Sequence, residues 1–369
     1  RPLPNGIYVP KLKCYPHLAE GSVLMQLTTV SVDLAKNVFQ LHAIDQQGKT
    51  ALRKQLKREQ VVPFFANLEP CLVGMEACGG AHYWARKLQA LGHTVKLMAP
   101  QFVKPYVKSN KNDVADAEAI CEAVTRPNMR FVPIKTVEQQ AILAVHCARQ
   151  GFVKARTAQA NSIRGLLGEF GVVLPQGIRH IVERLPDILE DHENALPGSL
   201  RQLMQRLMEH FKELDRQVVE LEREIQQWHR SNEGSCRLAE IPGVGPLTAT
   251  ALVASVGDAK NFSNGRQMAA WLGLVPRQHS SGGKPTLLGI SKRGDGYLRT
   301  LLIHGARSMV RVVESKTDPS ADWLKGLLAR RHTNVAVVAQ ANKTARIAWA
   351  LLAHGTKFRP DYTPDVTVA

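Results

Sequence analysis

Short apolar runs in the first third of the chain, separated by turns and helical stretches, limit the possible folds more than any other feature. Residues 27–33 (LTTVSVD) are a compact apolar run, and residues 38–44 (VFQLHAI) alternate apolar and polar positions like a half-buried strand. A third strand is expected after the turn that follows, and further strand-like runs lie at 71–75 and 94–98. Because the later runs alternate with helix-favouring stretches, we expect an α/β domain built on one sheet over residues 25–130. Helices are expected over residues 63–68, 81–91 and 113–124.

The middle of the chain is predicted to be almost entirely helical. Residues 136–170 form a long helical pattern, and Pro186 and Pro197 are expected to break the pattern that follows. From Leu207 to Trp228, apolar residues recur at intervals of three and four, a short heptad stripe. Such a stripe fits either a hairpin that packs on its own partner helix or an arm that forms a dimer.

These patterns divide the chain into five parts, an α/β domain followed by all-α domains. Residues 1–24 are proline-rich, lack periodicity and lack the basic-then-apolar order of a signal peptide, so we expect a disordered leader before a start at Met25. The other parts are the α/β domain over 25–130, a helical or coiled-coil linker over 131–235, a helical C-terminal domain over 236–352 and a loose tail over 353–369.

The charge of the chain is strongly positive and unevenly distributed. Over 369 residues, 48 Lys and Arg stand against 32 Asp and Glu, a formal net charge of +16. Residues 1–130 carry +7, residues 131–235 carry −1, and residues 236–369 carry +10. Two basic ends joined by a balanced middle indicate two modules that face a polyanion, with nucleic acid as the first choice.

Composition excludes two classes of protein. The chain is 44% hydrophobic and 22% charged, which is typical of globular proteins rather than disordered ones. No uninterrupted apolar run reaches the roughly 18–20 residues of a membrane span, so an integral membrane protein is excluded and no membrane partner is expected. The six cysteines lack metal-ligand spacing and are predicted to be buried thiols in a reducing, cytoplasmic compartment.

Four acidic residues follow or begin the predicted core elements. Asp33 ends one apolar run, Glu76 follows another, and Asp113 and Asp116 lie three apart at the start of a predicted helix, on one face. Each alone could be a turn residue or a helix cap. Together they predict a Mg²⁺ site, because clustered carboxylates need a cation and Mg²⁺ prefers oxygen ligands. We therefore expect the four carboxylates to converge within about 4–8 Å, around one or two ions.

A glycine-rich turn begins the C-terminal domain. The segment LAEIPGVGPLTATALVASV places Gly243 and Gly245 between two helical stretches. Glycines permit a tight turn, and the free N–H groups at the start of the next helix can hold a phosphate. This is a helix–hairpin–helix-like pattern that contacts DNA backbone; an ordinary helical corner is the alternative.

A basic loop follows this turn and contains two adjacent serines, Ser280 and Ser281, before Gly282 and Gly283. A serine among cations could attack a phosphodiester, with the cations stabilising the developing charge. From the residues alone, a loop of this kind is more often only flexible. The cations predicted to contact nucleic acid are Arg277, Lys284, Lys292, Arg293 and Arg299.

The segments VSVDLAKNVFQLHAID, GMEACGGAHYWARKL and KSNKNDVADAEAI together resemble the DEDD-type insertion-sequence transposases. The resemblance implies a ribonuclease-H-like N-terminal domain, as in Holliday-junction resolvases, with Asp33, Glu76, Asp113 and Asp116 as its metal ligands. The pattern Gly-Leu-Val-Pro, Ser-Gly, Ile-Ser-Lys-Arg-Gly and Leu-Arg is similar to the C-terminal transposase domain of the same family. There a serine forms a 5′-phosphoserine link to DNA, which implies Ser281 here, with Ser280 as the alternative.

The function expected from this resemblance is that of a transposase, a recombinase that cuts and rejoins double-stranded DNA at element ends and targets. The family further implies Mg²⁺, with Mn²⁺ possible, a structured noncoding guide RNA, and a homodimer or homotetramer. One alternative is a metal-dependent, junction-resolvase-like nuclease that uses water and forms no covalent intermediate. The other is a nucleic-acid-binding protein without catalysis.

Overall fold

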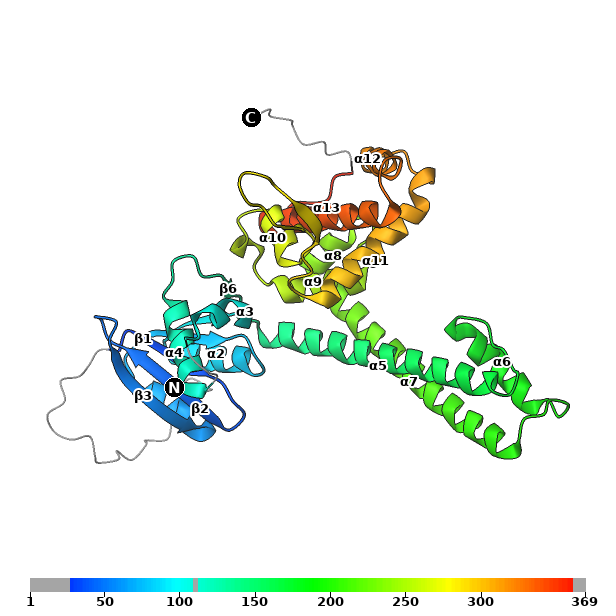
Figure 1. Ribbon diagram of the computed structural model, residues 1–369, viewed down its shortest axis with the longest axis horizontal. Coiled ribbons are helices and arrows are strands. Elements are labelled where there is room, and N and C mark those ends of the chain that lie inside the picture. Colours follow the sequence, from blue (N-terminus) through cyan, green and yellow to red (C-terminus); the bar gives the residue numbers. More distant parts are fainter. Residues whose placement is uncertain (1–26, 109–111, 361–369) are drawn as a thin grey trace, which may run out of the picture. The chain divides into compact units, whose positions relative to one another are not determined.

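The computed structural model describes residues 27–108 and 112–360, and its internal contacts divide the chain into two compact units, Arg1–Ile134 and Lys135–Ala369 (Figure 1). The leader predicted over residues 1–24 lies outside the described residues, as do residues 361–369 of the predicted tail.

The strands predicted for unit 1 are confirmed, including the third strand after the early turn. The helix expected over 63–68 begins and ends two residues earlier. A strand that was not predicted, β6, extends the sheet beyond residue 130. The elements of unit 1 are β1 (Thr29–Asp33), β2 (Val38–Ile44), β3 (Thr50–Lys57), η1 (Arg58–Gln60), α1 (Val61–Ala66), β4 (Leu72–Glu76), α2 (Ala81–Ala90), β5 (Thr94–Met98), α3 (Pro100–Val103), η2 (Lys104–Tyr106), α4 (Asp113–Val124) and β6 (Phe131–Val132).

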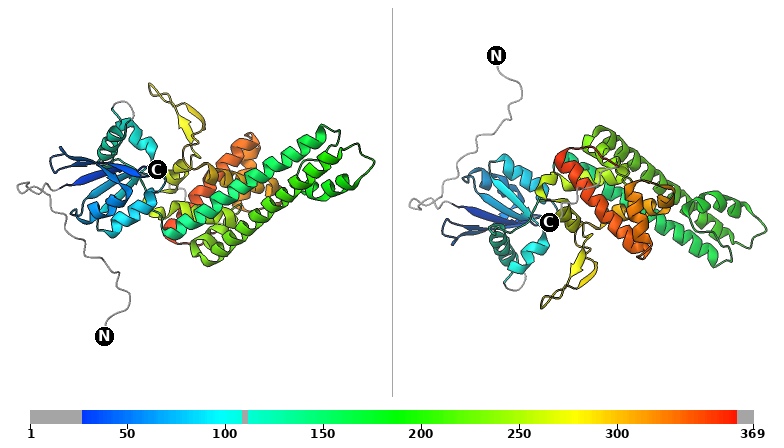
Figure 2. Two further views of the ribbon diagram at one scale, coloured as in Figure 1. Left: turned by 90° about the horizontal axis from the view of Figure 1, so that it is seen from below. Right: turned by 90° about the horizontal axis from the view of Figure 1, so that it is seen from above.

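The sheet of unit 1 has six strands in the order β3-β2-β1-β4-β5-β6. Strands β1, β4 and β5 are parallel, whereas β2, β3 and β6 pair antiparallel with their neighbours. Alternate residues of β1 and β2 face opposite sides, so Val32 and Phe39 join the core with Phe65 of α1 and Trp84 of α2. Helix α4 covers the other face (Figure 2). A mixed sheet with helices on both faces agrees with the ribonuclease-H-like fold that the resemblance implies.

Unit 2 begins with a long helical hairpin, the arm, made of α5 (Val137–Gly168), α6 (Ile178–Glu190) and α7 (Gly198–Ser231) (Figure 1). Leu207 and Phe211 from the heptad stripe pack in one cluster with Ile163 and Leu167 of α5. Ion pairs of α5 arginines with α7 carboxylates border this contact. The stripe therefore packs on its own partner helix, which is the hairpin alternative.

Pro186 was expected to break a helix, and this was wrong, because it lies inside α6. A proline within a helix costs about 3 kcal/mol through its missing N–H and its ring. Ile181 and Leu185 of α6 are fully buried in the arm core, and their burial offsets that cost at about 1.5–3 kcal/mol each.

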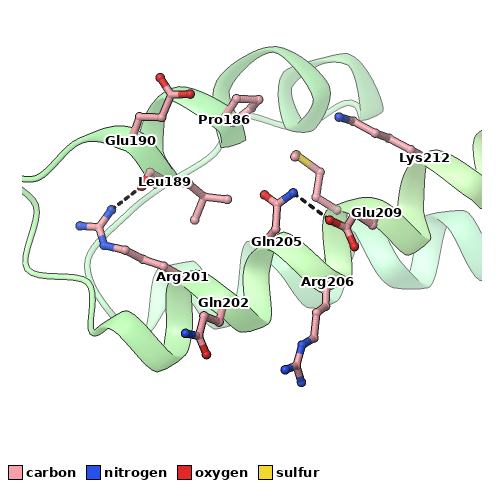
Figure 3. A pocket seen from close by; sticks show the side chains of 10 residues that line it. Pro186, Leu189, Glu190, Arg201, Gln202, Gln205, Arg206, Glu209 and Lys212 are labelled. Atoms are coloured by element: carbon pink, nitrogen blue, oxygen red, sulfur yellow. Dashed lines mark hydrogen bonds between the residues drawn. The ribbon is translucent and has the colours of Figure 1, made fainter.

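The end of the arm is fastened by Arg201 (Figure 3). Its guanidinium donates to the Leu189 and Asp191 carbonyl oxygens, each at 2.8 Å, and to the Leu196 carbonyl at 3.2 Å. A cavity of about 700 Å³ lies between α6 and α7 beside it. Because these carbonyls occupy the guanidinium, we interpret Arg201 as a structural residue that closes the α6–α7 connection.

The rest of unit 2 is a helical bundle around α13, from which a two-stranded hairpin projects (Figure 2). Small buried residues of α13, such as Ala341 and Ala345, let neighbouring helices approach closely. The elements are α8 (Glu233–Ala239), α9 (Pro246–Val256), η3 (Ala259–Asn261), α10 (Gly265–Trp271), β7 (Pro276–Gln278), β8 (Leu287–Ile290), α11 (Gly296–Val312), η4 (Val313–Ser315), α12 (Pro319–Leu328) and α13 (Thr333–His354).

The cysteines only partly follow the sequence prediction. Cys71 and Cys121 are buried, but Cys78, Cys147 and Cys236 are exposed on loops or outer helix faces, so predicting every thiol to be buried was wrong. Within residues 27–108 and 112–360, none of the helices combines the length and apolar character needed to cross a bilayer.

Candidate active site

Two of the four predicted acids end neighbouring parallel strands. Strands β1 and β4 pair with Val32 opposite Met75, so the residues that follow, Asp33 and Glu76, reach the same edge of the sheet. Both are partly buried. Val32 before Asp33 and Met75 before Glu76 are buried, which fixes the strand register and therefore the position of both acids.

Cys78, in the turn before α2, is influenced by both carboxylates. Burial raises the pKa of the Cys78 thiol, and the charges of Glu76 and Asp33 raise this pKa further. Both carboxylates therefore act on the same sulfur. A raised pKa disfavours the thiolate form of Cys78 at neutral pH. The donors at this edge are carboxylate oxygens, which fit Mg²⁺ or Mn²⁺ better than a thiolate-binding metal.

Helix α4 is held across β1 and β4 by two close contacts. The Ser31 hydroxyl donates to the Ala117 carbonyl oxygen at 2.6 Å. At the end of the helix, a Cβ on Gly74 would lie 2.9 Å from the Val124 Cβ, so a glycine is needed there. Leu72, at the start of β4, packs in the same cluster as Val124. Both contacts hold α4 against the same face of the sheet, over the middle of β1 and β4.

The other two acids lie in the first turn of α4. Asn112 caps α4, and its side-chain oxygen accepts from the Ala115 N–H at 2.8 Å. Asp113 and Asp116 follow three residues apart, on one helix face as predicted. Acids in the first turn also interact favourably with the helix dipole.

The predicted convergence of all four carboxylates is wrong for the side-chain positions in this structure. In the parts of the chain that the structure describes, no three side chains of histidine, cysteine, aspartate or glutamate gather closely enough to hold a metal ion. Ionised carboxylates repel one another and share a site only where a cation offsets their charge. The assignment of the four acids as metal ligands stays a prediction.

The two serines lie at the tip of the hairpin formed by β7 and β8. Gly282 and Gly283 have φ values of +56° and +74°, the left-handed conformations that a tight two-residue hairpin turn requires. The turn closes with the Lys284 N–H donating to the Ser281 carbonyl at 3.1 Å. The Ser280 hydroxyl accepts from the Gln278 amide at 2.9 Å, whereas the described residues offer no hydrogen bond to the Ser281 hydroxyl.

The base of this hairpin depends on two glycines. A Cβ on Gly273 would lie 2.1 Å from the Arg293 carbonyl oxygen, and one on Gly294 would lie 1.9 Å from the Trp271 carbonyl oxygen. The close approach brings Lys292 and Arg293 to the hairpin base, and both are exposed. The exposed predicted cations Arg277, Lys284, Lys292 and Arg293 make no ion pair within the described ranges.

Arg299 differs from the other predicted cations. It is only partly exposed, and its guanidinium donates to the Leu272 carbonyl at 3.1 Å, which joins α11 to the end of α10. We interpret this contact as structural.

The two glycines of the turn between α8 and α9 have different environments. Gly243 has φ +80°, and a Cβ on it would lie 2.7 Å from the Gly305 carbonyl of α11, so this glycine is packed against the bundle. Gly245 is exposed and caps α9 without a side-chain hydrogen bond, and a Cβ there would meet nothing within 4 Å. Of these two glycines, only Gly245 lies at an open helix start, where a phosphate could bind.

A buried polar cluster that the sequence analysis missed connects the arm to the bundle. His146 of α5 is 1% exposed and lies 3.0 Å from both the Tyr297 hydroxyl and the Thr250 hydroxyl. Burial, followed by the charge of Arg149, lowers the pKa of His146 to about 4. A lone histidine inside a long helical pattern gives no sequence signal for such a cluster.

Two family models match parts of this chain. A family model for DEDD transposases of the IS110 type, described as "Transposase", matches residues 30–171, and one described as "Transposase IS116/IS110/IS902 family" matches residues 235–320.

Three curated relatives are similar over almost their whole length. "Probable family 20 transposase" of Pseudomonas aeruginosa is 53% identical over 91% of this chain and 100% of its own. The "Transposase for insertion sequence element IS1328" of Yersinia enterocolitica is 47% identical over 90% of this chain and 98% of its own. The "Transposase for insertion sequence element IS1111A" of Coxiella burnetii is 46% identical over 97% and 98%.

Proposed function

Because the chain belongs to the IS116/IS110/IS902 family of insertion-sequence transposases, and is therefore a DNA transposase, we propose that it cuts and rejoins DNA through a serine-linked intermediate. In this proposal Asp33, Glu76, Asp113 and Asp116 hold Mg²⁺ or Mn²⁺, and Ser281 is the nucleophile. The proposal is supported by Asp33 and Glu76 at the ends of adjacent parallel strands, and by Asp113 and Asp116 in the first turn of α4, which packs on the same sheet.

The proposed covalent step conserves the number of phosphodiester-type bonds. The Ser281 Oγ attacks phosphorus, an Oγ–P bond forms, and the P–O3′ bond breaks. The serine proton passes to water, and the departing strand end takes up a proton as a 3′-hydroxyl. A second strand's 3′-hydroxyl then attacks the phosphoserine in the reverse sense, so rejoining needs no ATP. A bound divalent metal would polarise the phosphate oxygens.

Two observations favour Ser281 over Ser280 as the nucleophile. The Ser280 hydroxyl accepts a hydrogen bond from Gln278, whereas the Ser281 hydroxyl has no such partner among the described residues. Ser281 also lies at the closing pair of the turn, opposite Lys284. We infer that the exposed cations of the hairpin and its base contact phosphates and stabilise the charge that develops on them.

We also propose a guide RNA, an oligomeric state and a cellular compartment for this chain. A guide RNA follows from the family resemblance, and the basic charge of the chain favours binding to either nucleic acid. A homodimer or homotetramer is proposed because recombination cuts several strands in register. With DNA as substrate, the proposed compartment is the bacterial cytoplasm.

The test is to trap the covalent intermediate. Element-end DNA, the element's RNA and Mg²⁺ are incubated with wild-type protein and with Ser281→Ala, Ser280→Ala and Asp33→Asn variants, and adducts are mapped by mass spectrometry. We expect a serine-linked DNA peptide from wild type and Ser280→Ala and none from the other two. Undiminished cleavage by Ser281→Ala and Ser280→Ala without any adduct would instead identify a nuclease that uses water.

A further inference from the structure

A large groove in unit 2 is separate from the acids and from the serine tip. It has a volume of about 1980 Å³ and runs along α13, between the start of α10, helix α12 and residues 356–360. Pro276, Leu288 and Ile290, from the two strands of the serine hairpin, line one end. The groove therefore adjoins the hairpin that carries Ser281.

The charge lining this groove has one sign. Five cationic side chains and no aspartate or glutamate line it, and none of the five forms an ion pair among the described residues. Unpaired cations around a concave surface focus a positive potential that attracts an anionic ligand. The five are Arg266, Lys343, Arg346, Lys357 and Arg359.

The groove also offers apolar and aromatic surface. Trp323 is 37% exposed, and the Lys343 Nζ lies 4.4 Å from the centre of its ring, a cation–π pair. Leu288 and Val335 are 48% and 52% exposed on the lining. Large apolar side chains left open beside cations match a ligand with both flat apolar faces and negative charge.

The floor of the groove is rigid. The Trp349 indole N–H donates to the Ala259 carbonyl at 3.1 Å, and the Asn342 amide donates to the Leu274 carbonyl at 3.2 Å. The Phe358 N–H donates to the Glu240 carboxylate at 3.1 Å, which holds the 356–360 wall. These contacts shape the groove without using its cations or Trp323.

We propose that this groove binds an unpaired strand of nucleic acid and holds it beside the serine hairpin. An unpaired strand exposes base faces for stacking on Trp323 and phosphates for Arg266 and Arg346, whereas a duplex hides its base faces. The proposal rests on the proposed function, because a DNA transposase handles strand ends next to the phosphate it cuts. DNA and RNA share this chemistry.

The test measures binding without catalysis. Fluorescence anisotropy follows labelled oligothymidylate and oligouridylate of about twelve nucleotides, a length within single-strand site sizes, in EDTA over a range of salt. Trp323→Ala removes the stacking surface, and Arg266→Gln with Arg346→Gln removes two cations. The matched control is Arg307→Gln with Arg311→Gln, two exposed α11 arginines that do not line the groove.

The two groove variants should change different properties of oligonucleotide binding, the affinity in one case and the salt dependence in the other. Trp323→Ala should weaken binding about fivefold or more, the lower end of a stacked base, without changing the salt dependence. The Arg266→Gln, Arg346→Gln variant should reduce the slope of log K against log salt by about 1.4, because each single-strand phosphate contact contributes about 0.7. The arginine control should bind as wild type, and the oligonucleotide that binds more tightly identifies the natural strand.

Either of two results would overturn the proposal: unchanged binding by both groove variants, or equal competition by a blunt duplex. Ser281→Ala should bind normally, so loss of the covalent adduct and loss of groove binding are separate outcomes.

Discussion

Acidification should destabilise unit 2 through the buried His146. This imidazole lies among Tyr297, Thr250 and the helices that join arm and bundle, and burial lowers its pKa to about 4. In the unfolded chain the same group titrates near its ordinary value of about 6.5. The unfolded state therefore binds a proton first as the pH falls, so the stability is complete above about pH 6.5 and declines toward pH 4.

The size of the effect follows from the two pKa values. Between about pH 7.5 and pH 4.5, proton linkage with values of 6.5 and 4 removes about 2.5 kcal/mol from the free energy of unfolding. His146→Gln keeps a neutral polar side chain beside both hydroxyls but has no proton to bind in this range. Its free energy of unfolding should fall about 2.5 kcal/mol less than that of wild type over the same interval.

Urea unfolding monitored by tryptophan fluorescence measures this difference. Four of the five tryptophans, at positions 228, 271, 323 and 349, belong to unit 2, so the signal reports mainly on that unit. Carboxylates titrate in both proteins and cancel in the comparison. Equal losses of stability in wild type and His146→Gln would refute the assignment of this pH dependence to the buried imidazole.

Three further predictions concern the sheet edge and the backbone. Asp33→Asn, or added Mg²⁺, should speed the labelling of Cys78 by iodoacetamide near pH 8.5, because each reduces the negative charge that raises the pKa of this thiol. Peptide mass spectrometry measures the labelling rate, and an unchanged rate would contradict a carboxylate site shared by Asp33 and Glu76. Gly74→Ala should lower the melting temperature of unit 1, and Val124→Ala should restore part of it in the double variant, because it removes the Val124 methyl groups that would lie 3.0 and 3.2 Å from the new Cβ. Gly294→Ala should destabilise unit 2 by more than about 2 kcal/mol in thermal unfolding, because its φ of +92° and the contact with a backbone carbonyl both exclude a side chain.

The sheet could be predicted because its strands are short apolar runs that can be recognised from the local sequence alone. The same runs fixed the places of Asp33 and Glu76, since a buried strand positions whatever residue ends it. The position of α4 could not be predicted, because it depends on contacts such as Ser31 with Ala117, 86 residues apart in the sequence. Long-range packing of this kind leaves no local periodicity.

The serine hairpin was missed as an element for a different reason. Residues 276–290 lack the regular alternation of a half-buried strand, because every residue from Pro276 to Gly289 is exposed. The pair Gly282-Gly283 was the available signal, since two adjacent glycines favour a tight hairpin turn. The groove lined by Trp323 left no comparable pattern, because its walls come from separate helices.

The exposure of the β7–β8 hairpin bears on the proposed role of Ser281. A two-stranded ribbon without a covering layer is only marginally stable by itself, so little work is needed to tilt or bend it. In the proposed mechanism, the Ser281 hydroxyl on such a ribbon would take up its position for attack only once a nucleic acid binds the ribbon. Cleavage would then be confined to DNA that the protein already holds.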